Sequence, residues 1–333
     1  MRVKNKVLKI VYFMQIIILI LFTIYGWKTA VFNVENWPGD ECPAQATSNC
    51  STERADAFKN KMNDFGHTSG CRYTNNDVQA ADFHEDRDFS GHDNWCADGY
   101  RNGDEVGALW YSGHGGLKKY NYIHPEFIAA LSHKNGSNYW CAINGEYIDD
   151  NECLNCDSTG HSTSKGCWIH SECMRLGENP GNYYANPYNG YSNYAFFDTC
   201  CSATLNYIDY LWDQTGQGVH IIGGFNNIKS DPIYWWWFSW HCNSDAADWV
   251  ENFVEDVHSG SSITESFLIN LKWETKACPV IIAFDTSSNS CYNRLDNENW
   301  ENSNWYTNDP VNGGSVYCYQ YFENCPGNGT CGL

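Results

Sequence analysis

Two short apolar stretches of this chain each lead directly into a chemically reactive side chain. Residues 106–111 are followed closely by His114, and residues 194–197 are followed closely by Cys200. Continuous apolar runs of this length are typical of strands buried in a parallel sheet. The carboxyl ends of neighbouring parallel strands open into one crevice, so two such strands would bring the imidazole of His114 and the thiol of Cys200 together.

Strand-like and helix-like stretches alternate along most of the chain and predict an α/β fold. Phe127, Ile128 and Leu131 form an apolar stripe at helical spacing in one of these stretches. Alternating strands and helices form crossover units, so we expect a three-layer α/β/α sandwich with a mainly parallel sheet. The predicted strands are 106–111, 194–197, 219–222 and 280–284, and the predicted helices are 51–64, 124–132, 203–212, 246–257 and 263–273.

Both reactive residues lie in short motifs that resemble those of a known superfamily. Ser-Gly-His-Gly-Gly at 112–116 and Asp-Thr-Cys-Cys-Ser at 198–202 are similar to the His and Cys motifs of metacaspases and of the wider caspase, gingipain and legumain superfamily. Together with residues 219–225, they also resemble an uncharacterised domain family of prokaryotic proteins related to that superfamily. The resemblance covers about residues 104–285 and implies a caspase-like fold with cysteine endopeptidase activity and no required cofactor.

The sequence departs from the metacaspase pattern in two respects. Metacaspases usually follow the nucleophile with one residue and then Ser-Gly, whereas Cys200 is followed by Cys201, Ser202 and Ala203. The interval between the two motifs is also longer, and it contains a Cys-rich, Asn-rich and Tyr-rich insertion at about 135–193. We therefore expect a different turn after the nucleophile and an insertion that covers the site or forms a lid.

The resemblance implies a role for each residue of the expected site. His114 would act as general base or as the imidazolium partner, and Cys200 would attack a peptide carbonyl to form a thioester. The backbone N–H groups of Gly115 and Cys200 would stabilise the oxyanion. Asp198 matches an acidic position that lines the first specificity pocket of metacaspases, which implies cleavage after Arg or Lys. The alternative is an acid satisfied by local N–H groups.

The amino-terminal segment predicts export from the cytoplasm. Basic residues precede an apolar run at 10–24, which is the pattern of a signal sequence. Residues 7–27 approach the roughly 20 residues that span a bilayer, so we expect 1–28 to be a signal peptide or a signal anchor. The remainder would be extracellular or at the cell surface. It would comprise a caspase-like domain at 29–288 and a Cys-, Asn- and Tyr-rich extension at 289–333.

Seventeen cysteines fit an oxidising compartment, where disulfides persist. Because this number is odd, at least one cysteine is not in an intrachain disulfide. A disulfide between the adjacent Cys200 and Cys201 would be strained, so one arrangement places Cys201 in another bridge and leaves Cys200 as the thiol. A further group predicts a zinc site or, as we favour outside the cell, two disulfides: Cys153, Cys156, Cys167 and Cys173.

One acidic loop resembles the first half of a calcium site. Asp86, Asp88 and Ser90 alternate as the oxygen ligands of a calcium loop do, and a glycine follows at position 91. The twelfth position is Ala97 rather than the bidentate Glu of that loop. The loop is therefore either a weak Ca²⁺ site or a solvated acidic segment.

The charge of the chain limits its partners. The formal net charge is −20, which disfavours nucleic acid and anionic lipid as partners. This charge favours solubility outside the cell or the attraction of a cationic substrate, and the expected partner is a peptide or protein substrate. Acceptor patterns at Asn49, Asn135 and Asn328 predict a glycoprotein. Residues 7–27 would provide a membrane anchor, and the sequence does not indicate an oligomeric state.

Three functions are consistent with these features. The first is a secreted or anchored cysteine endopeptidase. The second is a catalytically inactive domain of the same fold that binds partners at a surface, because a fold alone does not guarantee activity. The third is a glycan-binding surface protein that uses the aromatic run at 234–241. We rank them in this order, and a reactive thiol at Cys200 would separate the first from the others.

Overall fold

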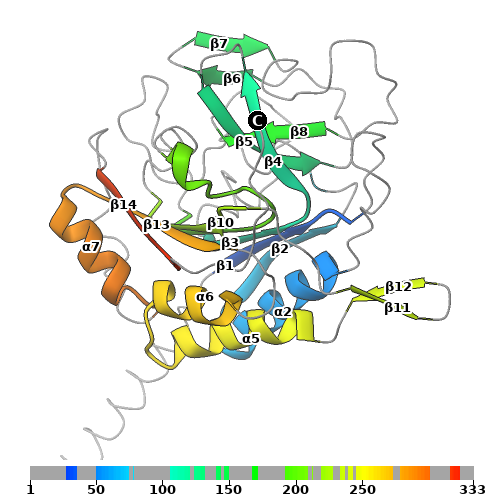
Figure 1. The fold of residues 1–333 in the computed structure, drawn as a ribbon. Helices are drawn as coiled ribbons and strands as arrows, with labels where there is room; N and C mark the ends of the chain where they lie inside the picture. Colours follow the sequence, from blue (N-terminus) through cyan, green and yellow to red (C-terminus); the bar gives the residue numbers. More distant parts are fainter. Residues whose placement is uncertain are drawn as a thin grey trace, which may run out of the picture.

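The chain folds around a central sheet of seven strands with helices packed on it (Figure 1). In this computed structural model the described residues are 28–35, 50–74, 78, 106–120, 124–131, 140–143, 146–149, 167–171, 192–208, 212, 219–227, 233–236, 239–242, 245–272, 278–300 and 316–322. This arrangement confirms the predicted α/β class.

The central sheet is mixed but mostly parallel. Its strand order is β14-β13-β10-β9-β3-β1-β2. All neighbours from β2 to β10 are parallel, whereas β13 is antiparallel to β10 and β14 is antiparallel to β13. The strands are β1 Lys28–Asn33, β2 Thr68–Thr74, β3 Val106–Ser112, β9 Tyr194–Asp198, β10 Ile221–Phe225, β13 Pro279–Asp285 and β14 Val316–Tyr321.

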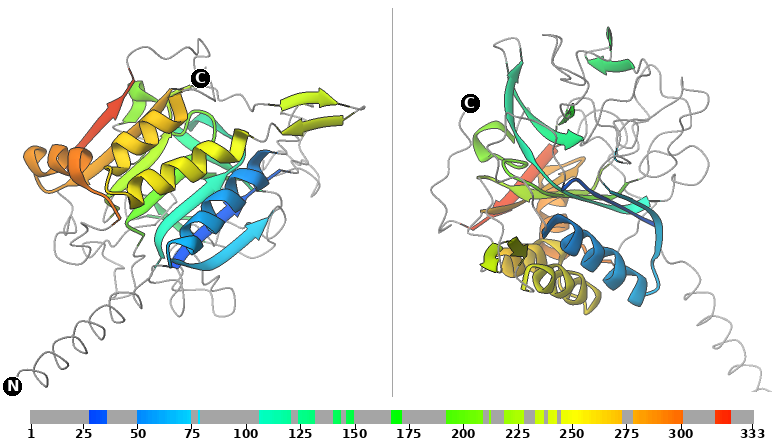
Figure 2. Two further views of the ribbon diagram at one scale, coloured as in Figure 1. Left: turned by 90° about the horizontal axis from the view of Figure 1, so that it is seen from below. Right: turned by 90° about the vertical axis from the view of Figure 1, so that its right-hand side faces the viewer.

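Helices α2, α5 and α6 cover one face of this sheet (Figures 1 and 2). They span Cys50–Asp64, Asp245–His258 and Ile263–Lys272. Their apolar sides form one core cluster with inward-facing residues of the strands. In α5 the buried residues recur at the spacing of a single helix face, which explains why this helix was predictable: Trp249, Val250, Phe253, Val254 and Val257.

Side chains of β3 and β9 alternate between the two faces of the sheet. Trp110 faces the helices, and its ring stacks on that of Phe58 in α2 with centroids 4.9 Å apart. Tyr111 and Phe197 face the opposite way, and their ring centroids lie 6.1 Å apart. All four rings are fully buried, so both faces of these strands are covered by protein.

Three smaller antiparallel sheets accompany the central one among the described residues. β4 Gly115–Tyr120 follows β3 almost directly and pairs with β5 His124–Leu131, which also pairs with β8 Cys167–His170. In Figure 1, β4 and β5 lie on the side of the central sheet opposite α2, α5 and α6. The other pairs are β6 Trp140–Ile143 with β7 Glu146–Asp149, and β11 Ile233–Trp236 with β12 Ser239–Cys242.

One of the predicted helices is wrong, and another begins later than expected. Residues 124–131 form strand β5, because their apolar side chains lie in a segment that pairs with strands on both sides. In the described part of 203–212, turns and the single-turn 3₁₀ helix η4, Leu205–Tyr207, precede Ile208, which has a helical conformation. Helices α2, α5 and α6 and strands β3, β9 and β13 lie where the sequence predicts them, and β10 begins two residues later than expected.

The carboxyl-terminal region takes part in the central sheet. Strand β14 pairs along β13, and a disulfide between Cys291 and Cys318 joins this strand to α7, Ser288–Asn297. Ser287 caps α7 by accepting a hydrogen bond from the Ser290 N–H. The expected extension at 289–333 is therefore disulfide-stapled, and its described part forms one edge of the main sheet.

A buried polar network anchors α7 at the end of the sheet where β9 and β10 begin. Glu298 Oε1 lies 2.5 Å from the Tyr194 hydroxyl and 2.6 Å from His220 Nδ1, and Arg294 bridges Glu298 to Asp285. Burial alone would raise the pKa of Glu298, but His220, Arg294 and Tyr194 together hold this pKa below its ordinary value. The network is thus a satisfied set of charges rather than an isolated buried acid.

Several predicted features lie outside the described residues. These are the signal sequence or anchor at 1–28, except for Lys28, which begins β1, the acidic loop with Asp86, Asp88 and Ser90, and most of the insertion at 135–193. The described parts of the insertion contribute strands β6, β7 and β8. Within the described segments, no helix is both long enough and apolar enough to cross a membrane.

Candidate active site

His114 and Cys200 lie just beyond the carboxyl ends of two neighbouring parallel strands. β3 and β9 pair in register as far as Ser112 and Asp198, and each reactive residue follows two positions after its member of this pair. Beyond the strands, the Gly113 N–H donates to the carbonyl oxygen of Asp198 over 3.4 Å. Both reactive residues are partly exposed. The fold therefore brings the thiol and the imidazole to the same end of the sheet, where the parallel strands finish.

The loop that carries His114 is short and closely held. The hydroxyl group of Tyr111 donates a hydrogen bond of 3.2 Å to the carbonyl oxygen of His114. Gly113 permits this contact, because a Cβ atom there would lie 2.7 Å from the Tyr111 hydroxyl oxygen. Gly115 follows at once as the first residue of β4. His114 is therefore fixed between two strands.

The turn that carries Cys200 rests on β10. The Cys201 N–H donates to the carbonyl oxygen of Asn227 over 3.1 Å, and the Ala203 N–H donates to that of Phe225 over 2.9 Å. Because these bonds connect the turn to a neighbouring strand, the position of Cys200 depends on β10 as well as on β9.

Ser202 forms a second support for this turn. Its hydroxyl oxygen accepts a hydrogen bond of 2.9 Å from the Phe225 N–H, and its hydroxyl group lies 3.0 Å from the carbonyl oxygen of Phe197. The indole N–H of Trp212 donates to the Ser202 carbonyl oxygen over 2.9 Å. Gly224 makes this close approach possible, since a Cβ atom there would lie 2.5 Å from Ser202 Oγ.

The adjacent cysteines have different chemical states. Cys200 carries a thiol, whereas Cys201 is disulfide-bonded, as the sequence predicted. Cys201 has a φ of 60°, a left-handed conformation that residues other than glycine adopt rarely. This conformation turns the chain immediately after Cys200. Such uncommon backbone geometry persists where the surroundings enforce it, and it often marks a functional site.

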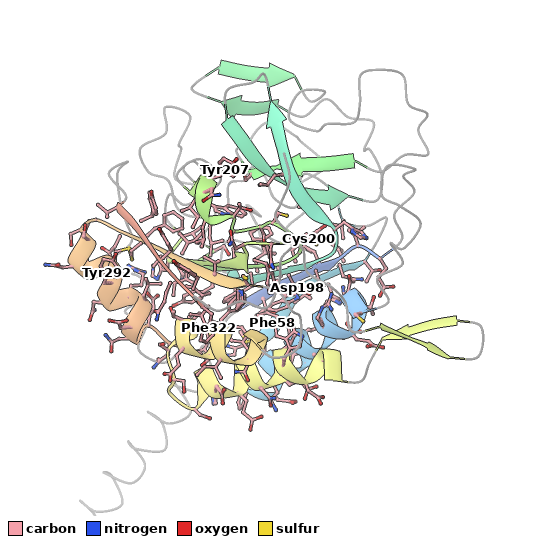
Figure 3. All side chains as sticks on the ribbon, in the orientation of Figure 1. Phe58, Asp198, Cys200, Tyr207, Tyr292 and Phe322 are labelled. Carbon is pink, nitrogen blue, oxygen red and sulfur yellow. A yellow bond between two sulfur atoms is a disulfide. The ribbon has the colours of Figure 1, made fainter. Side chains whose placement is uncertain are left out.

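The carboxylate of Asp198 is bound inside the protein. Its Oδ2 atom lies 2.5 Å from Arg54 Nε and accepts a hydrogen bond of 2.6 Å from Ser112 Oγ. The side chain is fully buried, on the side of the sheet that faces α2 and Phe58 (Figure 3). Of the two alternatives for Asp198, an internally satisfied acid describes this geometry. Arg54 and Ser112 contribute side-chain groups to it, whereas the sequence suggested local N–H groups.

Sequence reasoning missed the residues that support the site. Arg54 carried the clearest signal, because it lies one turn before Phe58 on the apolar side of a predicted helix, where a charged residue requires a buried partner. Ser202 and Asn227 carried no such signal. Their contacts join the turn after β9 to β10 and its carboxyl end, which only the folded chain brings together.

The site contains the thiol of Cys200 and the imidazole of His114, each following the end of its strand. Gly115, an expected oxyanion donor, directly follows His114, and Cys200 supplies the second expected N–H group. Among the described residues, no group of three or more His, Cys, Asp or Glu side chains is arranged to hold a metal ion. The expected calcium ligands Asp86, Asp88 and Ser90 lie outside these residues.

Comparisons with known proteins leave the family open. No protein-family model matches the chain, and no curated protein or solved structure matches it significantly. The fold and the site therefore define only a class. This is an α/β protein with a mostly parallel sheet that presents a thiol and an imidazole at the carboxyl ends of two neighbouring strands. A function for this chain has to follow from the chemistry of those two groups.

Proposed function

We propose that this chain is a caspase-like cysteine endopeptidase with Cys200 and His114 as its catalytic pair. The observation that carries the proposal is the position of a cysteine thiol and a histidine beyond the register-paired ends of β3 and β9. Their sequence motifs, which resemble those of metacaspases, support it independently. A three-layer sandwich belongs to the same proposal and is supported by the buried rings on both faces of β3 and β9.

The proposed reaction proceeds through a covalent intermediate. His114 takes the proton of Cys200, and the thiolate attacks the carbonyl carbon of the peptide bond to form a C–S bond. The C–N bond breaks, and the imidazolium donates its proton to the leaving amine. A water molecule then gives a proton to His114 and attacks the thioester carbon to form a C–O bond. The C–S bond breaks, the acid product leaves, and the imidazolium returns its proton to the Cys200 thiolate. Gly115 and Cys200 would donate their N–H groups to the oxyanion.

The proposal places the protein outside the cytoplasm, either secreted or anchored at the cell surface. Disulfides persist in oxidising compartments, and the basic and apolar amino-terminal segment has the pattern of a signal. A peptidase at this location would act on peptides or proteins and needs no cofactor for the proposed chemistry. Five described cysteines are disulfide-bonded: Cys50, Cys201, Cys278, Cys291 and Cys318.

Cleavage of an unstructured peptide pool by the non-reduced protein tests this proposal. New peptide ends are identified by mass spectrometry, and peptides with Arg or Lys before the cleaved bond are compared with matched Ala peptides. We expect Cys200→Ala to abolish cleavage, because it removes the nucleophile. We expect His114→Ala to slow cleavage by about 100-fold or more, because it removes the proton acceptor.

The exposed Asp296 on α7 provides a matched surface control. Asp296→Asn should cleave the same bonds at the wild-type rate. Cleavage that persists in Cys200→Ala would contradict the proposal. If wild type cleaves nothing and Cys200 reacts slowly with alkylating reagents, the inactive binding domain becomes the better account of this chain.

A further inference from the structure

A buried polar cluster of Arg54, Asp198 and Ser112 lies directly beneath the candidate active site. Asp198 Oδ2 is 2.5 Å from Arg54 Nε and 2.6 Å from Ser112 Oγ. None of the three residues is more than 2 % exposed. A carboxylate buried without a compensating charge is strongly unfavourable, so Arg54 is what permits a charged Asp198 at this position.

The cluster is attached to a rigid base, helix α2. Phe58 of this helix stacks on Trp110 of β3, and Arg54 reaches Asp198 from one turn earlier. The start of the helix is also fixed, because the Thr52 N–H donates to a carboxylate oxygen of Glu35 over 3.0 Å. The first turns of α2 therefore lie at the end of the sheet where β3 and β9 finish.

Asp198 connects this base to both reactive loops. Its carboxylate accepts from the last residue of β3, Ser112, and its carbonyl oxygen accepts from the N–H of Gly113, which directly precedes His114. Asp198 is also the last residue of β9 and precedes Cys200 by two positions. A displacement of Asp198 would therefore move the His114 loop and the Cys200 turn relative to each other.

The same contacts oppose a role for Asp198 in recognising a cationic substrate. A substrate guanidinium or ammonium group would have to compete with Arg54 for the Asp198 carboxylate, inside a cluster that is at most 2 % exposed. Within the proposed function, on which this step rests, we infer that Arg54 and Asp198 are positioning residues. Their ion pair holds the ends of β3 and β9 on α2 so that His114 acts on Cys200.

The coupling between His114 and Cys200 tests this inference. The alkylation rate of Cys200 is measured in the non-reduced full chain by iodoacetamide labelling and peptide mass mapping, each time with and without His114→Ala. In the wild-type background we expect His114→Ala to slow labelling by about tenfold or more. In the Arg54→Met/Asp198→Asn background, which removes both charges of the ion pair, this ratio should fall below about threefold.

Two further backgrounds separate positioning from general stability. Arg294→Met/Asp285→Asn removes another buried Arg–Asp pair among the described residues, at the opposite end of the strands, and it also withdraws Arg294 from Glu298, which keeps His220 and Tyr194 as partners. This double variant should keep the wild-type ratio. Ser112→Ala removes one hydrogen bond and no charge, so this variant should fold even where the double variant does not. We expect it to lower the ratio by about twofold or more, because it frees one strand end.

The outcomes distinguish this inference from the proposed function. A wild-type ratio near one would overturn the proposed function, because the imidazole would then not act on the thiol. A large wild-type ratio that persists in the Arg54→Met/Asp198→Asn and Ser112→Ala backgrounds would overturn the positioning role and leave the proposed function intact. If the labelling ratio fell equally in the Arg294→Met/Asp285→Asn background, Arg54 and Asp198 would contribute only to the general stability of the fold.

Discussion

Cys200 owes its position to residues that are not themselves reactive. Cys201 turns the chain in a left-handed conformation and is held by a disulfide, and Ser202 connects the turn to the backbone of β10. Together these contacts restrict the conformation of the turn. The thiol is therefore presented at a defined place by the backbone of this turn.

Gly224→Ala should disturb this presentation. The new Cβ atom would lie 2.5 Å from Ser202 Oγ and 3.1 Å from the Cβ atom of Ala203, so the turn after β9 must shift. We expect a loss of about 1–3 kcal/mol in the free energy of unfolding and slower labelling of Cys200. Urea denaturation and alkylation mass mapping measure the two effects.

Gly116→Ala is the matched control, because no atom lies within 4 Å of the added Cβ atom. It should keep the wild-type stability. If Gly224→Ala matched wild type in both stability and labelling, the contact between Ser202 and β10 would not support the turn.

The reactive residues could be predicted from the sequence, whereas their supports could not. His114 and Cys200 each follow an apolar strand in a recognisable motif, which is local information. The partners of Asp198 come from α2 and β3, and those of Ser202 from β9, β10 and Trp212. No sequence spacing indicates such non-local contacts. The sequence therefore identified the chemistry but left the role of Asp198 open between two alternatives.

At the scale of elements, helices α2 and α5 meet at their carboxyl ends through histidines. Gly66, with a φ of 87°, ends α2, and the N–H of the next residue, His67, donates to the Met62 carbonyl oxygen. His258, the last residue of α5, stacks on Phe65 with ring centroids 3.8 Å apart. Burial and the nearby His258 lower the pKa of His67 to about 4.

Acid should therefore loosen the contact between α2 and α5. His67 binds a proton near pH 6.5 in the unfolded chain but only near pH 4 in the folded one, so its contribution is complete above about pH 6.5 and is lost as the pH falls toward 4. Between pH 7 and pH 5, wild type should lose about 2 kcal/mol more unfolding free energy than His67→Gln. Urea denaturation at both pH values measures this difference.

His114→Ala serves as the control for this pH dependence, because it removes a partly exposed histidine from another part of the fold. It should lose stability with acid as wild type does. If wild type and His67→Gln lost the same unfolding free energy between pH 7 and pH 5, His67 would have the same pKa in the folded and the unfolded chain.

Some elements were predictable because their pattern is local and others were not. The apolar faces of α5 and α6 and the buried run of β13 indicate their own structure. The stripe of Phe127, Ile128 and Leu131 fits a helix, yet pairing with β4 and β8 makes it a strand. Strand β14 alternates tyrosines with Cys318 and Gln320 in an Asn- and Cys-rich region, so its composition suggested an extension instead of a sheet edge.

At the scale of the whole molecule, the two ends of the parallel strands carry different features. Where β9 and β10 begin, the network around Glu298 anchors α7, and the disulfide of Cys291 and Cys318 joins this helix to β14. Where β3 and β9 end, short loops carry His114 and Cys200. Loops on a rigid scaffold are where reactive groups are commonly placed. Substitutions of His114 and Cys200 themselves therefore lie away from the network that anchors α7.

The reactivity of Cys200 in the folded protein, relative to the same residue in the unfolded chain, tests the central claim most directly. The alkylation rate is measured by mass mapping at pH 7, in buffer and in urea, for non-reduced wild type and His114→Ala. A catalytic pair predicts that folded wild type reacts faster than its unfolded form, and that His114→Ala reverses this order. If Cys200 reacts more slowly in the folded state of both proteins, the thiol and the imidazole do not form a catalytic pair.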